Sequence, residues 1–379
     1  MHVLKRLTAV AAIAWSSLCG ADPGVTDSSI TIGMSSPFSG PNGAYGLDMR
    51  QAIEAYFKQI NSTGGINGRK LDLVALDDGY ETERTVANTR TLINDKNVFA
   101  LLAYYGSSPT TEAMNQVFGP AKVPLVGTIS GADTLRQPIA SNPNSRYMFN
   151  VRASYADETE AIVNQMAALG LKNIAVFYQN DGFGKSGLDG VTAALKKHNL
   201  APSAVASVER NSLDVAKAVD IIAKTTPQAV VMITLYKPTA AFIKAMKLAG
   251  QFPMLMTVSP VGAGQLVQEL GADSRGIGIS QVMPYPWNNV TPIVRDYQKL
   301  SDKQNYSYYG LEGYVMARTL VEGLKRAGKD LSREKLISAL ESLNNTDLGG
   351  YRINYGSNAR VGSRFVELTV VGAGGKVMK

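Results

Sequence analysis

Short apolar runs alternate with longer amphipathic segments along most of the chain. The runs, such as Phe99–Tyr105 and Ala229–Thr234, are typical of strands buried in a parallel sheet. The segments between them, such as Glu81–Asn94, place apolar residues at helical spacing. This alternation predicts an α/β fold built on doubly wound, Rossmann-like parallel sheets.

The predicted elements form two series of similar pattern, and the second series starts near Arg152. The first series predicts strands at Ser29–Met34, Lys70–Leu76, Phe99–Tyr105 and Val123–Val126, and helices at Leu47–Ile60, Glu81–Asn94 and Thr110–Phe118. The second predicts strands at Asn173–Tyr178, Ser203–Val208, Ala229–Thr234, Met254–Val258 and Gly276–Met283, and helices at Ala156–Leu169, Gly184–His198, Asp214–Thr225 and Thr239–Ala249. After a break at Pro284–Trp287, we expect helices at Val290–Lys303, Gly310–Ala327 and Arg333–Leu343 and a final strand at Arg364–Val371.

The first 21 residues have the pattern of a secretory signal peptide. Lys5 and Arg6 precede an apolar run, Leu7–Leu18, and small residues follow around Cys19. The run is shorter than the roughly 20 residues that a membrane-spanning helix needs. We expect cleavage after Ala21 and export of the mature chain. Lipid attachment at Cys19 is the less favoured alternative, because the leucine before it suits a lipidation motif poorly.

Composition excludes several classes of function. The net charge is +7, and because the basic residues form no block, a nucleic-acid surface is not expected. Beyond the predicted leader the chain has no cysteine and a single histidine, His198, which we expect to be solvated near a helix end. A Ser-His-Asp triad, a cysteine nucleophile and a typical zinc site are therefore not expected. We predict no enzymatic activity, no cofactor and no metal.

One strand-to-helix junction stands out. The apolar run that ends at Tyr105 is followed by Gly106, two serines and Pro109. Serine is a good helix N-cap and proline suits the first turn, so we expect a serine-capped helix at this point. Free N–H groups at such a helix start, with the hydroxyls of Ser107 and Ser108, could bind an anion such as a carboxylate. An ordinary junction with a normal cap is the alternative.

Six short motifs follow one another in a recognisable order. They are Ser36–Gly40 before Ala44–Gly46, Gly64–Lys70, Asp77–Asp78, Gly106–Ser108, Asn180–Gly184 and Leu311–Tyr314. Together they resemble the type I periplasmic solute-binding proteins of ABC transporters, and most nearly the leucine/isoleucine/valine-binding group. The resemblance extends over essentially the whole mature chain.

This resemblance implies two lobes joined by three crossovers, so that each lobe is built from two separate stretches of chain. After the leader, 1–21, the first lobe would contain residues 28–150 and 284–354, and the second would contain residues 151–283 and 355–379. A small ligand would bind between the lobes, which would close over it.

The resemblance also implies a function and a location. The protein would be a monomeric periplasmic binding protein for a small carboxylate-bearing ligand, such as an amino acid or a related organic or aromatic acid. It would deliver this ligand to the membrane permease of an ABC transporter. A ligand-sensing module that serves a signalling receptor is the alternative, since the sequence is compatible with both.

Residues of the first lobe can be assigned to the ligand site by this resemblance. Ser107 would bind the ligand carboxylate through its hydroxyl and its backbone N–H, and Tyr45 would form a wall of the pocket. Ile129 would supply a backbone carbonyl. Gly131 stands where the family has threonine, and the hydroxyl of Ser130 would substitute for it. Ser108 and Tyr105, beside Ser107, complete the candidates from this lobe.

The second lobe would contribute fewer groups. Tyr236 keeps the aromatic hydroxyl of the family, whereas Phe183 replaces a tyrosine and would offer only a stacking face. Ser259 stands where amino-acid binders have a glutamate that pairs with the ligand ammonium. The loss of this acid weakens the expectation of an α-amino acid, because an unpaired buried ammonium is costly. Asp181 and Glu312 are other acids that could supply the charge.

Three further features leave alternatives open. Tyr80 and Gly106 occupy the places of the family's paired cysteines, so that crosslink is expected to be absent. Asp77 and Asp78 could bind a cation, but we favour capping of the following helix. Tyr104 and Tyr105 could equally be plain strand core with their hydroxyls reaching the surface. Tyr306, Tyr308 and Tyr309 could line the mouth of the cleft, but we favour packing over the first lobe.

Overall fold

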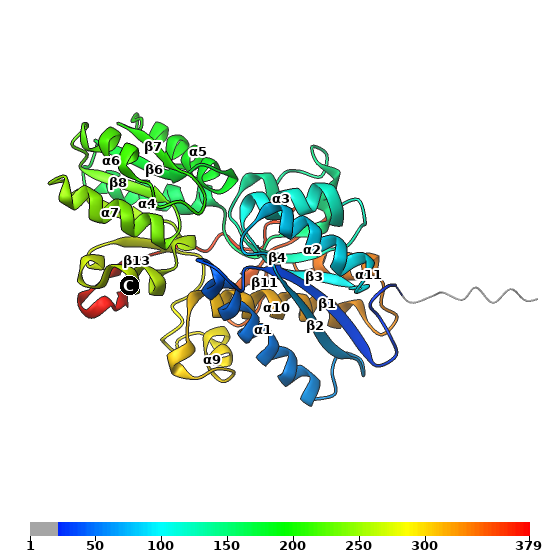
Figure 1. Ribbon diagram of the computed structural model, residues 1–379. Coiled ribbons are helices and arrows are strands. Elements are labelled where there is room, and N and C mark those ends of the chain that lie inside the picture. Colours follow the sequence, from blue (N-terminus) through cyan, green and yellow to red (C-terminus); the bar gives the residue numbers. More distant parts are fainter. Residues whose placement is uncertain (1–21) are drawn as a thin grey trace, which may run out of the picture.

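The computed structural model describes residues 22–379, so the predicted signal peptide and Cys19 lie outside the described residues. Two mostly parallel sheets form the cores of two lobes that lie next to each other (Figure 1). The predicted α/β fold class is therefore confirmed. None of the helices within residues 22–379 combines the length and the apolar character needed to span a bilayer.

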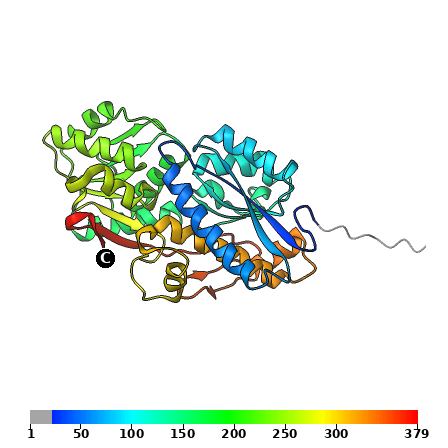
Figure 2. The same ribbon diagram turned by 60° about the horizontal axis from the view of Figure 1, so that its bottom comes forward.

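Lobe 1 is built on a sheet with the strand order β2-β1-β3-β4-β5, in which all neighbours are parallel. Its strands are β1 (Ser29–Ser36), β2 (Lys70–Asp77), β3 (Ala100–Tyr105), β4 (Leu125–Ile129) and β5 (Met148–Phe149). Helices α1 (Gly43–Ser62) and α10 (Tyr308–Ala327) lie together on one side of this sheet, and α2 (Thr82–Asn94) and α3 (Ser107–Ala113) lie on the other (Figures 1 and 2). Every residue of β3 is buried, as its apolar run predicted.

Lobe 2 has the strand order β14-β13-β10-β9-β8-β6-β7. Its strands are β6 (Ile174–Gln179), β7 (Val205–Val208), β8 (Ala229–Ile233), β9 (Met254–Thr257), β10 (Gly278–Gln281), β13 (Glu367–Val371) and β14 (Val377–Met378). Its helices are α4 (Tyr155–Ala168), α5 (Gly182–Lys197), α6 (Ala216–Ala223), α7 (Tyr236–Leu248) and α8 (Ala263–Leu270). The strands from β7 to β10 are parallel, β13 pairs antiparallel with β10, and β14 pairs antiparallel with β13.

The remaining elements extend lobe 1. They are α9 (Pro292–Gln298), α11 (Arg333–Glu341) and a small antiparallel pair, β11 (Thr346–Asp347) and β12 (Arg352–Ile353). Some predicted limits were wrong by several residues: α1 starts four residues before Leu47, β4 starts at Leu125, and the helix expected over Val290–Lys303 is only α9. The segment after α3, Met114–Phe118, continues as a π-helix, which the sequence pattern did not predict.

Both sheets share one topology, and this topology determines where a ligand could bind. Read from β2 or from β7, each sheet has the order 2-1-3-4-5 of doubly wound folds. In such sheets a crevice opens where the strand order reverses, beyond the carboxyl ends of the strands. The reversal lies between β1 and β3 in lobe 1 and between β6 and β8 in lobe 2. Segments that follow these four strands meet across the junction of the lobes: the N–H of Gly182 donates to the Ser108 hydroxyl, and the Tyr236 hydroxyl donates to the Pro41 carbonyl.

Three chain segments connect the lobes and are bonded to one another. The backbone of Asn150 exchanges hydrogen bonds with Arg360 and Gly362, at 2.8 and 2.7 Å, so the first and third segments run side by side. The hydroxyl of Tyr351 donates to the carbonyl of Val151 at 3.3 Å and to that of Val282 at 3.2 Å. Tyr351 therefore links the first and second segments.

Candidate functional site

Ser107 and Ser108 lie at the junction between the lobes, at the start of α3, but neither caps this helix as predicted. The N-cap residue is Gly106, and no side chain bonds to the free N–H groups of the first turn. The buried Ser107 hydroxyl is bonded to the Ser130 hydroxyl at 2.7 Å. The Ser108 hydroxyl accepts a 3.1 Å hydrogen bond from the backbone N–H of Gly182, in lobe 2. Both hydroxyls bond to groups that are distant in sequence, and neither caps the helix.

Tyr80 packs directly against Gly106, at the positions where the resemblance places paired cysteines. A Cβ added at Gly106 would lie 2.4 Å from Cε2 of Tyr80, and Gly106 has a φ of +92°, which favours glycine. The two positions are therefore adjacent in space, as cysteines of a disulfide would be. The Tyr80 ring therefore fills the space that a disulfide between these two positions would occupy.

Tyrosine rings form a continuous cluster between the lobes. The Tyr45 ring is stacked on Tyr105 at 5.6 Å between centroids, lies 4.5 Å from Tyr309, and meets the edge of Tyr236 at 5.9 Å. Tyr80 meets Tyr105 at 5.1 Å. The expectation that Tyr309 packs only over the first lobe was wrong, because its hydroxyl donates across the junction to the carbonyl of Pro260, at 2.9 Å.

Within this tyrosine cluster, the hydroxyl of Tyr105 needs a hydrogen bond from a ligand or a water molecule. It is buried and has no hydrogen-bond partner among residues 22–379. By contrast, the hydroxyl of Tyr104, the preceding residue, is bonded to the Thr89 hydroxyl at 3.0 Å on the other side of the strand. A buried hydroxyl without a partner is unfavourable, so Tyr105 is well suited to contact a bound polar group.

The loop after β4 brings Ile129, Ser130 and Gly131 to the same junction. The carbonyl of Ile129 accepts from the N–H of Gly106 at 3.1 Å, which fixes this loop to the start of α3. At Gly131 an added Cβ would lie 2.4 Å from the backbone nitrogen of Tyr155 and 2.6 Å from its ring. Tyr155 therefore occupies the space that a threonine side chain would need, which explains glycine at this position.

The residues predicted from lobe 2 also lie at the junction. The buried ring of Phe183 packs on Tyr155, with 5.1 Å between centroids. The hydroxyl of Tyr236 donates to the carbonyl of Pro41 in lobe 1, at 2.9 Å. Asp181 caps α5 by accepting from the N–H groups of Phe183 and Gly184, so this acid is already engaged in holding its helix.

Ser259 lies beside a buried charged group that sequence reasoning missed. The carboxylate of Glu158 accepts from the backbone N–H of Ser259 at 2.8 Å, from its hydroxyl at 3.1 Å and from the Ser280 hydroxyl at 2.6 Å. It also accepts from Nη2 of Arg152 at 3.0 Å, and Arg152 contacts the Ser259 hydroxyl as well. No local pattern marks these residues, because an Arg and a Glu six positions apart are common on any surface.

Glu312 completes this group and comes from lobe 1. It lies on α10, and its Oε1 is 3.6 Å from Nε of Arg152, too far for a hydrogen bond. Both atoms are buried and lack a hydrogen-bond partner within the described part of the chain. Burial raises the pKa of the Glu312 carboxyl to about 7, against the lowering effect of Arg152. Glu312, which the sequence named as a possible acid, thus lies near Ser259, and both line one small cavity.

Two other predictions were wrong or only partly right. Asp77 and Asp78 do not cap α2, whose N-cap is Glu81; they accept from the backbone N–H groups of Gly79 and Tyr80 and hold the turn before the helix. Tyr308, which was expected to cover the first lobe, packs with Tyr285 and Trp287 and also against the core of lobe 2.

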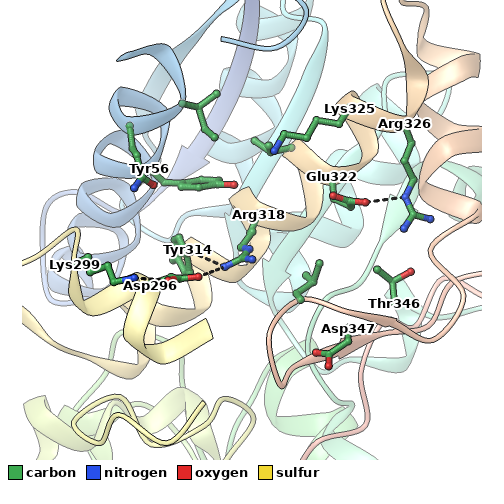
Figure 3. A pocket seen from close by; sticks show the side chains of 14 residues that line it. Tyr56, Asp296, Lys299, Tyr314, Arg318, Glu322, Lys325, Arg326, Thr346 and Asp347 are labelled. Atoms are coloured by element: carbon green, nitrogen blue, oxygen red, sulfur yellow. Dashed lines mark hydrogen bonds and ion pairs between the residues drawn. The ribbon is translucent and has the colours of Figure 1, made fainter. Parts of the chain in front are cut away.

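One surface groove lies elsewhere, on the outer side of lobe 1 between α1, α9 and α10. Most of its charged side chains are paired with one another, Asp296 with Lys299 and Arg318, and Glu322 with Arg326, while Lys325 and Asp347 also line it (Figure 3). A groove whose exposed charges are mostly paired with each other offers little specificity for a small ligand. The buried junction between the lobes is therefore the better candidate site.

The comparisons with known proteins agree with this geometry. A model of the family described as "Periplasmic binding protein" matches residues 29–376. The "Leu/Ile/Val-binding protein homolog 7" of Brucella abortus is 25% identical over 380 residues, which cover 93% of this chain and 91% of that protein.

Solved structures are similar over nearly their whole length. A substrate-binding periplasmic protein from Ralstonia solanacearum is 32% identical, with a TM-score of 0.85, and the match covers 92% of this chain and 99% of that one. A possible leucine/isoleucine/valine-binding protein from Rhodopirellula baltica is 30% identical, with a TM-score of 0.84, over 92% and 95% of the two chains. The chain belongs to the periplasmic binding protein family, as a type I member of its branched-chain amino acid-binding group.

Proposed function

We propose that this protein is the solute-binding component of an ABC transporter, which captures a small carboxylate-bearing ligand between its lobes and delivers it to the membrane permease. One observation carries the proposal: polar groups and aromatic faces from both lobes converge, buried, where the carboxyl ends of the two sheets meet. This is the position at which doubly wound sheets bind ligands. The names of the relatives, which refer to leucine, isoleucine and valine, support a ligand of that size.

Ser107 is the residue to which we assign the carboxylate. Its hydroxyl can donate to one carboxylate oxygen while it accepts from the Ser130 hydroxyl, with which it is already paired. The N–H groups at the start of α3 have no side-chain cap, and a helix start favours a negative charge. The faces of Tyr45, Tyr309 and Phe183 would surround the apolar part of the ligand.

A thermal-shift screen of the mature protein tests the proposal. The compounds are the amino acids, aliphatic and aromatic monocarboxylates, and the matching primary amides, which lack the anionic group. A ligand that binds only the folded protein raises its apparent stability by RT ln(1 + [L]/Kd), so a tight carboxylate should raise Tm clearly. If amides raise Tm as much as carboxylates do, or no carboxylate raises it, the proposed function is wrong.

A further inference from the structure

A polar contact joins the two lobes beside the tyrosine cluster, at the turn that precedes α2. From lobe 2 it includes Arg210 and Asn211, in the loop that follows β7. From lobe 1 it includes Glu81 and Thr82, at the start of α2, and Asn42, at the start of α1. We call these five residues the rim contact.

Three hydrogen bonds between side chains form the rim contact. Nδ2 of Asn211 donates to Oε1 of Glu81 at 2.7 Å, and Nη1 of Arg210 donates to the Thr82 hydroxyl at 3.0 Å. Nδ2 of Asn42 donates to Oδ1 of Asn211 at 3.3 Å, so Asn211 uses both ends of its amide on lobe 1. All three bonds join protein groups, and they can therefore form whether or not a ligand is bound.

Tyr80 connects the rim contact to the tyrosine cluster. Its hydroxyl accepts a 3.1 Å hydrogen bond from Nε2 of Gln179, in lobe 2. The guanidinium of Arg210 lies 5.6 Å from the centre of its ring, within the range of a cation–π interaction. The same ring is buried and meets Tyr105 edge-on. Closure at the rim is thus continuous with packing at the candidate ligand site.

The backbone is left-handed at one residue on each side of the contact. The φ angle is +62° at Asn211 and +65° at Tyr80. Asparagine tolerates this region, but a bulky residue such as tyrosine is uncommon there, and its strain persists only where the surrounding structure imposes it. Asp78 holds the turn by accepting from the N–H of Tyr80 at 2.9 Å. In this conformation both side chains bond to the opposite lobe.

The rim contact lies on the side of each sheet that is opposite to the connecting segments. Glu81 follows β2 and Arg210 follows β7, and these two strands are the outer edges of their sheets. The first connecting segment follows β5, which is the other edge of the lobe 1 sheet. When two lobes rotate about a hinge, the displacement grows with the distance from the axis. A small opening angle therefore separates the residues of the rim contact.

We propose that the rim contact is a latch that holds a fraction of the ligand-free protein closed. Glu81 and Thr82 receive the hydrogen bonds of Asn211 and Arg210 only when the lobes are together. The free protein then exchanges between an open and a closed form, and a ligand shifts this equilibrium. The inference goes beyond the proposed function, because it concerns the free protein and does not depend on which ligand binds.

An incidental contact is the competing explanation. Hydrogen bonds between exposed, mobile side chains often contribute little, and Asn211 is exposed. In that case the loss of the Asn211 side chain would leave the equilibrium between open and closed lobes unchanged. The test therefore measures the separation of the lobes directly.

Distances between two spin labels provide the first measurement. The chain has no cysteine after Cys19, so cysteines introduced at Ala87 on α2 and at Lys217 on α6, both exposed, are the only labelling sites of the mature protein. The protein is dialysed in denaturant and refolded to remove any bound solute. Pulsed electron paramagnetic resonance should then show a closed and an open population. Asn211→Gly accepts the same backbone angles and removes both hydrogen bonds, so it should lower the ratio of closed to open protein roughly threefold to tenfold.

Asn180→Ala is the matched control. Nδ2 of Asn180 donates to Oε1 of Glu209 at 2.7 Å, the same kind of bond as that between Asn211 and Glu81, but within lobe 2. This variant should keep the wild-type ratio. Tyr80→Phe, which retains the ring and loses the hydroxyl that bonds to Gln179, should lower the ratio.

A double-mutant cycle provides the second measurement. Glu81→Ala removes the acceptor on lobe 1. If Asn211 acts through Glu81, the two substitutions together should lower the ratio by less than the product of their single effects. Glu81→Ala combined with Asn180→Ala should show no such coupling.

The outcomes separate this inference from the proposed function. Equal ratios in wild type and Asn211→Gly, including a wild type that is wholly open, would overturn the latch, and so would an equal loss in Asn180→Ala. The proposed function would stand in each case, because the thermal-shift screen tests it independently.

Discussion

The hydroxyl of Ser108 in lobe 1 accepts a 3.1 Å hydrogen bond from the backbone N–H of Gly182, the first residue of α5 in lobe 2. The approach is close because residue 182 has no side chain: an added Cβ would lie 2.8 Å from the Ser108 hydroxyl oxygen. The helix starts that follow β3 and β6 are therefore in direct contact, and this contact requires the lobes to be closed.

Gly182→Val should hinder closure. The added side chain would collide with Ser108 only when the lobes approach, so binding of the best carboxylate should weaken by roughly tenfold or more. Small-angle scattering should show that ligand reduces the radius of gyration of the wild type and not that of the variant. Gly264→Ala, where the new Cβ meets nothing within 4 Å, is the control. Equal contraction of both proteins would contradict this account of closure.

Ser107→Ala should weaken ligand binding without unfolding the protein. It removes one donor to the carboxylate, and hydrogen bonds to charged groups contribute on the order of 1.5–3 kcal/mol, which corresponds to roughly tenfold to a hundredfold in Kd. Titration calorimetry measures the change. Ser62→Ala, at the exposed end of α1, should bind as the wild type does. Unchanged affinity of Ser107→Ala would mean that the carboxylate is bound elsewhere.

Gly131→Ala should destabilise the protein. The new methyl group would lie 2.4 Å from the backbone nitrogen of Tyr155, which itself donates to the Gly131 carbonyl at 2.9 Å. Forcing an atom into such packing costs on the order of 1–3 kcal/mol. Thermal unfolding should show a lower Tm, whereas Gly264→Ala, in an open part of α8, should leave it unchanged or raise it. A Tm equal to the wild type would show that Tyr155 can move away freely.

Glu312→Gln should stabilise the ligand-free protein at pH 8. The pKa of Glu312 is raised from 4.5 to about 7 in the folded state, so the folded protein binds the proton more tightly than the unfolded chain does. Its contribution to the free energy of unfolding is therefore greatest below pH 4.5 and falls as the pH rises to about 7. Between low and high pH, the contribution of Glu312 to the free energy of unfolding changes by on the order of 3 kcal/mol.

Urea unfolding of wild type and Glu312→Gln at pH 5 and pH 8 measures this contribution. The variant should lose less stability than the wild type between these two pH values. Glu322→Gln should follow the wild type at both. A larger loss in Glu312→Gln would mean that the carboxylate is stabilised in its ionised form by Arg152, and that the cost of its burial is already compensated.

The local pattern of the sequence determined the fold class and the position of the junction. The run that ends at Tyr105 could only be a buried strand, and the glycine and serines after it had to form a tight turn into a helix. Residues 45, 107, 130, 183 and 236 were placed at the site through the resemblance, and the structure brings their side chains to one junction. Their assignment to a ligand stays a prediction.

Only the tertiary structure decided how these groups are used. The serine hydroxyls of α3 have Ser130 and Gly182 as partners instead of the local cap, because partners distant in sequence offered buried hydrogen bonds. Arg152, Glu158 and Glu312 carry no local signal: the last is 160 residues from the first in the chain, and only the meeting of the lobes brings them within 3.6 Å. The hydrophobic periodicity of a sequence indicates which side of a helix or strand is buried. Which charged side chains meet between two lobes depends instead on the tertiary packing of the whole chain.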